Sequence, residues 1–231
     1  DMSASSEDYR LTAIVVVGAL LIVGLVVSAI DFGSVDINGL PAVTWCAIIA
    51  FGVQWLAWIP ASVSQTERFY DLTGGLTYLA VVVFSLWAGM QSEDPSTREW
   101  LISALVAIWA VRLSSFLFLR IHHAGKDGRF DQLKTSPVRF LVPWTLQGLW
   151  VFLTLNVVIV INSQSGSAPP LGIWDGIGLA LWILGFGIEV VADSQKTAFN
   201  SSPENEGKWI DEGLWSRSRH PNYLGEILLW T

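Results

Sequence analysis

The residues best suited to chemistry lie near the end of the sequence, in two charged runs at the ends of apolar segments. In the first run, Glu189, Asp193 and Lys196 are spaced by four and three residues, so a helix places them on one face. Asp193 and Lys196 alone could be a local ion pair that caps the segment. Glu189 lies a full turn deeper, where a carboxylate needs a partner or a polar ligand. The chain is only 14% charged, so this run indicates a functional site.

The second run leads into another apolar segment. Pro221 suits the first turn of a helix, and the residues before it expose backbone N–H groups at the positive end of the helix dipole. Arg217, Arg219 and His220 flank that end and could bind a pyrophosphate or a 2′-phosphate. Contact with anionic lipid headgroups is the alternative. Glu226 argues against it, because a carboxylate one turn into the helix suits a carboxamide, such as that of nicotinamide.

A third candidate is Arg112, which lies inside an apolar stretch. An arginine two turns within a membrane span must face the bundle interior or water. It could neutralise Glu189 or Glu226, or it could contact a cofactor phosphate.

A fourth group comprises Glu67, Tyr70 and Asp71, followed by Gly74 and Gly75. The acids and the phenol could donate a proton, and the glycines could allow close approach of the backbone to a substrate. The alternative is a turn at the membrane interface with Tyr70 in the aromatic belt.

Composition identifies the elements that must position these residues. The sequence is 52% hydrophobic with thirteen tryptophans, and its mean hydropathy is +0.49, which is typical of a polytopic membrane protein. We predict an all-α membrane helix bundle, forming a single transmembrane domain over residues 1–231. The six predicted spans are 11–30, 40–60, 77–90, 100–119, 138–161 and 171–191. A seventh begins at residue 223 and stops short at 231, so we expect the sequence to be truncated there.

The distribution of charge predicts orientation. Alternating spans place the N-terminus and the segments 61–76, 120–137 and 192–220 on one face of the membrane. With Arg139 counted, that face carries eleven of the thirteen Lys and Arg residues, so the positive-inside rule makes it cytoplasmic. Segment 192–220 is therefore predicted to be a cytoplasmic cofactor-binding loop.

Several other functions are excluded. One cysteine, Cys46, excludes an internal disulfide, and three histidines are too few for a histidine-rich di-iron site, so no metal is expected. Gly176 with Gly178, and Gly185 with Gly187, lie in an apolar span with no preceding strand and therefore indicate helix packing. No nucleic-acid-binding motif is present.

Two runs of sequence carry a resemblance to a known family. They are Gly185-Phe-Gly-Ile-Glu-Val-Val-Ala-Asp-Ser-Gln-Lys196 and Gly213-Leu-Trp-Ser-Arg-Ser-Arg-His-Pro-Asn-Tyr-Leu-Gly-Glu226, and the segments around Glu67–Gly75 and Val111–Phe130 support them. The chain resembles the steroid 5-alpha-reductase-like family, specifically its DUF1295 branch.

This resemblance implies a seven-helix membrane bundle that binds NADPH from the cytoplasmic side. The bundle would transfer hydride to an activated C=C bond of a sterol, enoyl lipid or isoprenoid. By position, Asp193, Asn222 and Glu226 match cofactor-binding residues and Arg112 matches a cofactor-contacting arginine, while Glu189 stands where steroid reductases use asparagine. With the two charged runs included, the expected cofactor-binding set is Arg112, Glu189, Asp193, Lys196, Arg217, Arg219, His220, Asn222, Tyr223 and Glu226.

The chain departs from the family at the substrate. Steroid reductases use a glutamate and a tyrosine to bind the substrate carbonyl, and a rough register places Trp55 and Trp109 at those positions. Protonation of an enone needs an acid near its carbonyl. Either Tyr70, Glu67 or Asp71 supplies the proton, or the substrate is of another kind.

Two other functions remain open. Isoprenylcysteine and phospholipid methyltransferases share an Arg-His-Pro-x-Tyr-x-Gly element, so a methyltransferase dependent on S-adenosylmethionine is one alternative. A non-catalytic subunit of a larger membrane complex is the other. The expected partners are a lipid or sterol substrate, membrane lipids and other membrane subunits. The expected location is the endoplasmic reticulum, the bacterial inner membrane or an organelle membrane.

Overall fold

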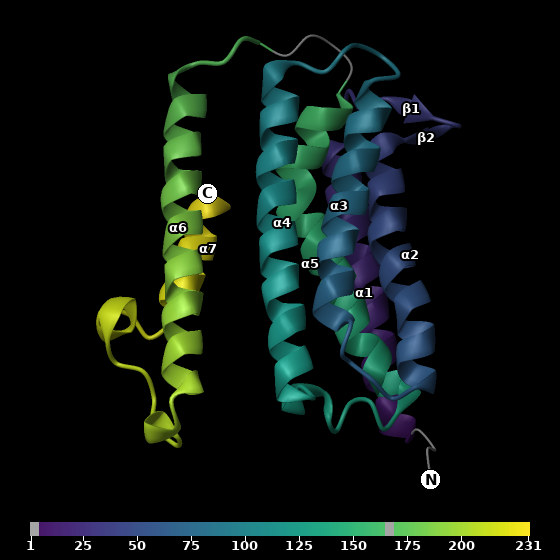
Figure 1. Ribbon diagram of the computed structural model, residues 1–231. Coiled ribbons are helices and arrows are strands. Elements are labelled where there is room, and N and C mark those ends of the chain that lie inside the picture. Colours follow the sequence, from purple (N-terminus) through teal and green to yellow (C-terminus); the bar gives the residue numbers. More distant parts are fainter. Residues whose placement is uncertain (1–4, 165–168) are drawn as a thin grey trace. The chain divides into compact units, whose positions relative to one another are not determined.

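A computed structural model describes residues 5–164 and 169–231, and it confirms the all-α fold class (Figure 1). The protein is 76% helical, with seven α-helices and a two-stranded hairpin in this part of the chain. The main elements, in order, are α1 (Ser6–Ile30), β1 (Asp36–Ile37), β2 (Leu40–Pro41), α2 (Ala42–Val63), α3 (Tyr70–Gly89), α4 (Thr97–Ala124), α5 (Pro137–Ser163), α6 (Ile173–Ser201) and α7 (Pro221–Leu229). Three short 3₁₀ helices are η1 (Gly128–Phe130), η2 (Pro203–Asn205) and η3 (Gly213–Ser216).

Helices α1 to α6 are each long and apolar enough to cross a membrane, which fits an integral membrane protein with six spans. Their first turns are set by local signals in the sequence. Ser5 and Asp8 form a capping box at the start of α1, in which the Ser5 hydroxyl accepts from the Asp8 N–H at 3.1 Å. Pro137 occupies the first turn of α5, directly after the N-cap Ser136.

Helices α3 and α6 extend furthest beyond one end of their predicted spans. Helix α3 begins at Tyr70, seven residues before the predicted start, because Gly74 and Gly75 serve helix packing. A Cβ atom on Gly75 would lie 2.4 Å from the Cβ of Ser114, and one on Gly74 would lie 2.7 Å from Nε2 of Gln147. Helix α6 continues through Ser201, so residues 192–201 of the predicted loop are helical. A span predicted from apolar residues ends where polarity begins, whereas a helix continues into water.

The chain divides into two compact units, residues 1–168 and residues 169–231. The single transmembrane domain over residues 1–231 stays a prediction.

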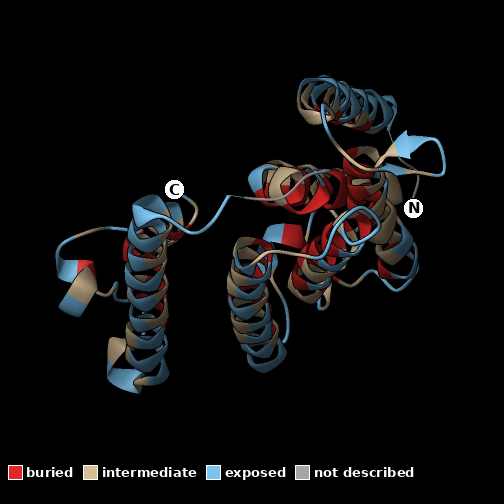
Figure 2. Ribbon diagram, turned by 90° about the horizontal axis from the view of Figure 1, so that it is seen from above, coloured by how far each residue is buried: buried red, intermediate tan, exposed pale blue. Residues whose placement is uncertain are grey.

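Helix α5 forms the centre of the first unit, where it packs against α1, α2 and α3. Figure 2 shows buried residues gathered where these helices meet. The largest fully buried side chains come mostly from α5 and include Trp144, Phe140, Phe152, Leu155 and Ile159. Exposed positions are often apolar as well, such as Leu25, Leu56 and Val83. In a membrane protein such outward residues suit contact with lipid tails. The second unit is built on the packing of α7 against α6.

Candidate functional site

The candidate site of the second unit depends on a close crossing of α6 and α7. Gly185 and Gly225 meet at this crossing. A Cβ atom on Gly225 would lie 2.5 Å from the carbonyl oxygen of Gly185 and 2.7 Å from the backbone nitrogen of Glu189. Only glycine allows the two backbones to come this close. The residues that follow each glycine are therefore brought together.

Three carboxylates and one amide gather beside this crossing. Glu189 and Asp193 lie one turn apart on α6 and are buried, with 2% and 7% of their surface exposed. Glu226 follows Gly225 on α7, is partly buried, and is close enough to Asp193 for their charges to repel. Asn222 lies one turn before Glu226, and its Oδ1 atom is buried with no hydrogen-bond partner in the described residues. This group of acceptors suits a ligand that presents N–H and O–H donors.

The segment after α6 folds back onto that helix. Trp215 of η3 donates its indole N–H to the Ala192 carbonyl at 3.0 Å, and the Leu214 N–H donates to the Gln195 side chain at 3.0 Å. The Lys196 ammonium lies 4.8 Å from the centre of the Trp215 ring, as in a cation–π contact. Lys196, a predicted cofactor ligand, is exposed, and this contact joins its side chain to the segment after α6.

The remaining predicted cations of this unit lie at the start of α7. Arg217, Arg219 and His220 are exposed, as is Tyr223. The His220 ring stacks on that of Tyr223 with 5.2 Å between centroids. The exposed basic side chains of the segment Arg217–His220 therefore lie just before α7, and the more buried Glu226 follows on α7 itself.

Arg112 belongs to the first unit. It is partly buried on α4, and its guanidinium carbon lies 5.2 Å from the centre of the Phe116 ring. Its predicted contact with a cofactor, or with the acids of α6 and α7, stays a prediction.

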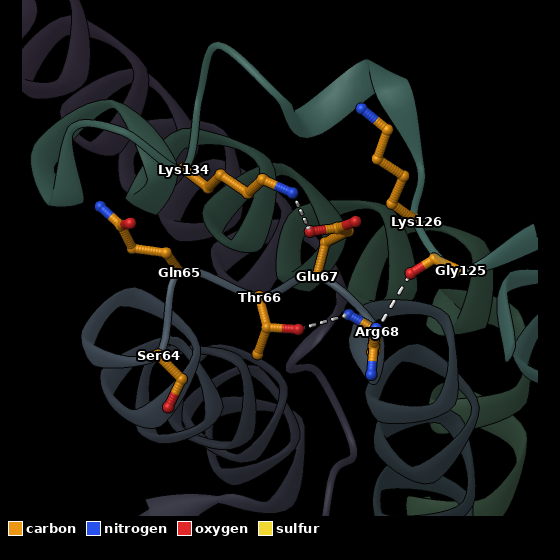
Figure 3. Close-up of a pocket in the computed structure, with 8 residues that line it drawn as sticks. All are labelled: Ser64, Gln65, Thr66, Glu67, Arg68, Gly125, Lys126 and Lys134. Atoms are coloured by element: carbon orange, nitrogen blue, oxygen red, sulfur yellow. Dashed lines mark hydrogen bonds and ion pairs between the residues drawn. The ribbon is translucent and has the colours of Figure 1, made fainter.

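Glu67, a predicted catalytic acid, joins two segments of the first unit (Figure 3). Its buried carboxylate accepts a hydrogen bond from the Lys134 ammonium at 2.8 Å and another from the backbone N–H of Asp127 at 2.9 Å. Burial raises the pKa of Glu67, but the Lys134 ammonium and the backbone N–H groups of Asp127 and Glu67 outweigh it. Together they hold that pKa below its usual range. Glu67 is therefore an ionised acceptor at neutral pH.

Tyr70 is committed in a similar way. Its hydroxyl donates to the Pro143 carbonyl at 2.9 Å, and its ring packs edge-on against Trp144 at 5.1 Å and on Phe130 at 4.9 Å. Asp71 is partly buried beside the charge of Arg129. Its carboxylate makes no hydrogen bond within the described residues. Of the three predicted acids, Asp71 is thus the one whose side chain is not already engaged in a hydrogen bond here.

The two tryptophans at the presumed substrate-ligand positions both pack within the first unit. The Trp55 indole N–H donates to the Thr145 hydroxyl at 3.1 Å. Trp109 is buried, and its ring meets that of Tyr78 edge-on at 4.9 Å. Neither side chain offers a carboxylate or a phenol to a substrate carbonyl.

Two partners of the predicted site residues were not predicted from the sequence. Lys134 lies 67 residues from Glu67, and no periodicity or motif connects the two. Trp215 was part of the Gly213–Glu226 run, but its packing against Ala192 and Lys196 was not predicted. An indole beside a cluster of ionisable residues was the available signal, because a buried Trp needs an acceptor for its N–H.

The fold and the site define an integral membrane helix bundle with an acidic cluster where two helices cross. Residues 57–231 match the family described as "Protein of unknown function (DUF1295)", and the chain therefore belongs to this family. An uncharacterized protein of Schizosaccharomyces pombe is 23% identical over 193 residues, which cover 72% of this chain and 55% of the yeast protein. The chain thus spans about half the length of that relative. No solved structure matches.

Proposed function

We propose that the protein is an NADPH-dependent membrane reductase that transfers hydride to an activated C=C bond of a sterol, enoyl lipid or isoprenoid. The observation that carries the proposal is the gathering of Glu189, Asp193, Asn222 and Glu226 at the crossing of α6 and α7. The buried, unpartnered Oδ1 of Asn222 supports it, because such an atom requires a donor from a ligand or from water. The resemblance to steroid 5-alpha-reductase-like proteins supports the same conclusion.

Different residues of the second unit suit different parts of the cofactor. Carboxylates repel phosphates, so Glu189 and Asp193 suit ribose hydroxyls, and Asn222 and Glu226 suit the carboxamide N–H groups. The phosphates would be bound by the exposed cations Lys196, Arg217 and Arg219 and by the exposed His220 side chain. Tyr223 would flank them through its stacking on His220. When bound, the reduced nicotinamide supplies the hydride.

The predicted proton donors are Glu67, Tyr70 and Asp71. Glu67 is an unsuitable donor because its carboxylate is held ionised, and the Tyr70 proton is directed at the Pro143 carbonyl. Asp71 is the better candidate acid, since its side chain has no hydrogen bond in the described residues. A carboxyl group that polarises an enone carbonyl could also protonate the carbon chain through an enol.

We place the cofactor side of the protein on the cytoplasmic face of the endoplasmic reticulum, a bacterial inner membrane or an organelle membrane. The excess of Lys and Arg on one side of the predicted spans supports this orientation.

A methyltransferase dependent on S-adenosylmethionine is the second candidate. The three clustered carboxylates favour it, because a sulfonium cation is attracted to negative charge and the ribose needs acceptors. The exposed cations Lys196, Arg217 and Arg219 in the same unit favour the reductase, because S-adenosylmethionine carries no phosphate.

Thermal unfolding of the detergent-purified protein with NADPH, NADH or S-adenosylmethionine tests both candidates. A ligand at one hundred times its dissociation constant stabilises the folded state by about 2.7 kcal/mol. We expect NADPH to raise the unfolding temperature most. Glu226→Gln should weaken this effect, whereas the matched control Glu204→Gln, at an exposed position of the same unit, should not.

A shift with S-adenosylmethionine alone would falsify the reductase. If none of the three ligands changes the unfolding temperature, the result would favour a non-catalytic subunit of a larger membrane complex. Equal losses in Glu226→Gln and Glu204→Gln would mean that the cofactor binds elsewhere.

A further inference from the structure

A second polar site lies in the first unit, at the turn between α2 and α3. The turn and the segment after α4 line an open pocket of about 630 Å³. Figure 3 shows the side chains that surround it. The residues that matter here are Ser64, Thr66, Glu67, Arg68, Lys126 and Lys134. None of them belongs to the proposed cofactor-binding set.

The charge of the pocket is positive, although the chain as a whole carries −7. Three cationic side chains line it against one carboxylate, that of Glu67. Glu67 is already neutralised by Lys134 and by the Asp127 N–H. With Glu67 paired in this way, the positive charge of Arg68 predominates at the pocket, and Lys126 pairs with Asp131, which is not among the lining residues.

Arg68 provides the geometry for an anion. Its Nε donates to the Gly125 carbonyl at 3.3 Å, which fixes the guanidinium beside the pocket. Its two terminal amino groups make no hydrogen bond with any residue that the structure describes. These groups form the planar donor pair that binds a phosphate through two hydrogen bonds. The Thr66 hydroxyl accepts a hydrogen bond from the backbone N–H of Arg68 at 3.4 Å and can still donate its own proton.

Lys126 is available as a second cation. Its ammonium pairs with Asp131 at 2.7 Å, but the two side chains are 65% and 38% exposed. Exposed pairs of this kind contribute little to stability. A doubly charged anion therefore competes well with the single carboxylate of Asp131. The backbone N–H of Thr66 is already bonded to the Ala61 carbonyl, so at this residue only the side-chain hydroxyl is left as a donor.

The pocket lies where a span ends. Helix α2 ends at Val63 and α3 begins at Tyr70, so the turn between them is at a boundary of the predicted hydrocarbon region. Phosphates of lipid headgroups lie at this depth, and basic pockets between spans bind them.

We propose that this pocket binds a phosphate monoester, held by Arg68 and Lys126 with Thr66 as a further donor. The ester is either the headgroup of an anionic phospholipid, such as phosphatidic acid, or a soluble phosphate. Phosphatidylcholine, whose phosphate is a singly charged diester masked by choline, binds more weakly.

The test measures binding to the purified chain in nanodiscs, without any nucleotide. Native mass spectrometry counts bound phosphatidic acid against phosphatidylcholine, and thermal unfolding in detergent with inorganic phosphate or glycerol 3-phosphate tests the soluble source. We expect phosphatidic acid to be retained preferentially. Arg68→Gln and Lys126→Gln should each weaken its binding roughly tenfold. Arg10→Gln is the matched control, because Arg10 is exposed and lies outside the pocket.

Stabilisation by soluble phosphates that depends on Arg68 would assign the site to a soluble ester. Binding of phosphatidic acid that Arg68→Gln and Arg10→Gln reduce equally would overturn the proposal, because it would reflect general attraction to the surface. Binding of no phosphate ester would also overturn it. Arg68→Lys keeps the charge but loses the paired donors, so partial loss in this variant separates phosphate recognition from misfolding.

Discussion

The pair formed by Glu67 and Lys134 links the turn after α2 to the segment before α5. Both side chains are largely withdrawn from water, at 2% and 19% exposed. A buried ion pair contributes little net stability, but removal of one partner leaves an uncompensated charge. The pair therefore acts mainly on specificity, because it fixes one arrangement of two connections that are distant in sequence.

Lys134→Met should destabilise the protein because it leaves the Glu67 carboxylate buried without its cation. We expect a loss of about 3 kcal/mol, which corresponds to a fall in unfolding temperature of roughly 6–12 °C for a chain of this size. Thermal unfolding in detergent measures it. Lys126→Met, which removes an exposed cation, should cost less than about 1 kcal/mol. A recovery in the double variant Glu67→Gln, Lys134→Met would confirm that the unpaired charge is the cause, and no recovery would contradict it.

The same pair predicts a dependence of stability on pH. The folded pKa of Glu67 lies below its unfolded value of about 4.3, so its contribution is present above that pH and is lost as the pH falls through the folded pKa. The Glu67 carboxylate raises the pKa of Lys134 above its unfolded value of about 10.4. The contribution of Lys134 to stability is therefore present below that pH and is lost as the pH rises through its folded pKa. We expect the unfolding temperature to fall less steeply below pH 4 in Glu67→Gln than in the wild type. If the unfolding temperatures of the variant and the wild type fall in parallel below pH 4, the prediction is wrong.

At the scale of elements, the crossing of α6 and α7 determines whether the acidic cluster exists. Gly225→Ala would place a methyl group 2.5 Å from the Gly185 carbonyl, so the two helices must separate. We expect a loss of about 1–3 kcal/mol. NADPH should also cease to stabilise the variant, because Glu226 and Asn222 move with α7. Thermal unfolding with and without NADPH measures both effects.

Gly187 is the matched control, because a Cβ atom there would meet nothing within 4 Å. Gly187→Ala should be neutral or stabilising by up to about 1 kcal/mol, since alanine favours helix more than glycine does. If both variants lose NADPH-dependent stabilisation equally, the close crossing does not build the site.

The sequence was sufficient for elements whose signal is local. Long apolar runs predicted all six spans, and the 189–196 run was correctly placed on one helix, α6. The start of α3 was wrong because Gly74 and Gly75 have the composition of a turn. Their packing partners, Gln147 and Ser114, lie on other helices, and a single sequence does not show which helices meet.

The first-unit acids show the same limit at the level of the site. Glu67 and Tyr70 were read as proton donors because their types and boundary position allow it. Their hydrogen bonds to Lys134 and to the Pro143 carbonyl span 67 and 73 residues. Contacts of that range depend on tertiary packing, so composition cannot show which of these side chains are already engaged in hydrogen bonds.

For the whole molecule, the uneven distribution of Lys and Arg residues is the strongest indication of its orientation in the membrane. Eleven of thirteen Lys and Arg residues lie on the side of the predicted spans that includes the 120–137 and 192–220 segments. Both the proposed cofactor cations and the phosphate pocket depend on this orientation, since cytosolic nucleotides and most anionic lipids occupy the same face.

Cysteine labelling in intact cells tests that orientation. The native Cys46 is buried and should react poorly, so the wild-type chain provides the background. Ser92→Cys, Thr135→Cys and Glu204→Cys introduce thiols at exposed positions after α3, before α5 and after α6. A membrane-impermeant maleimide should label Ser92→Cys from outside, and the other two only after lysis. Labelling of Thr135→Cys in intact cells would place the phosphate pocket outside, while labelling of Glu204→Cys alone would mean that α6 does not cross. Labelling of Glu204→Cys in intact cells would also place the proposed cofactor cations out of reach of cytosolic NADPH.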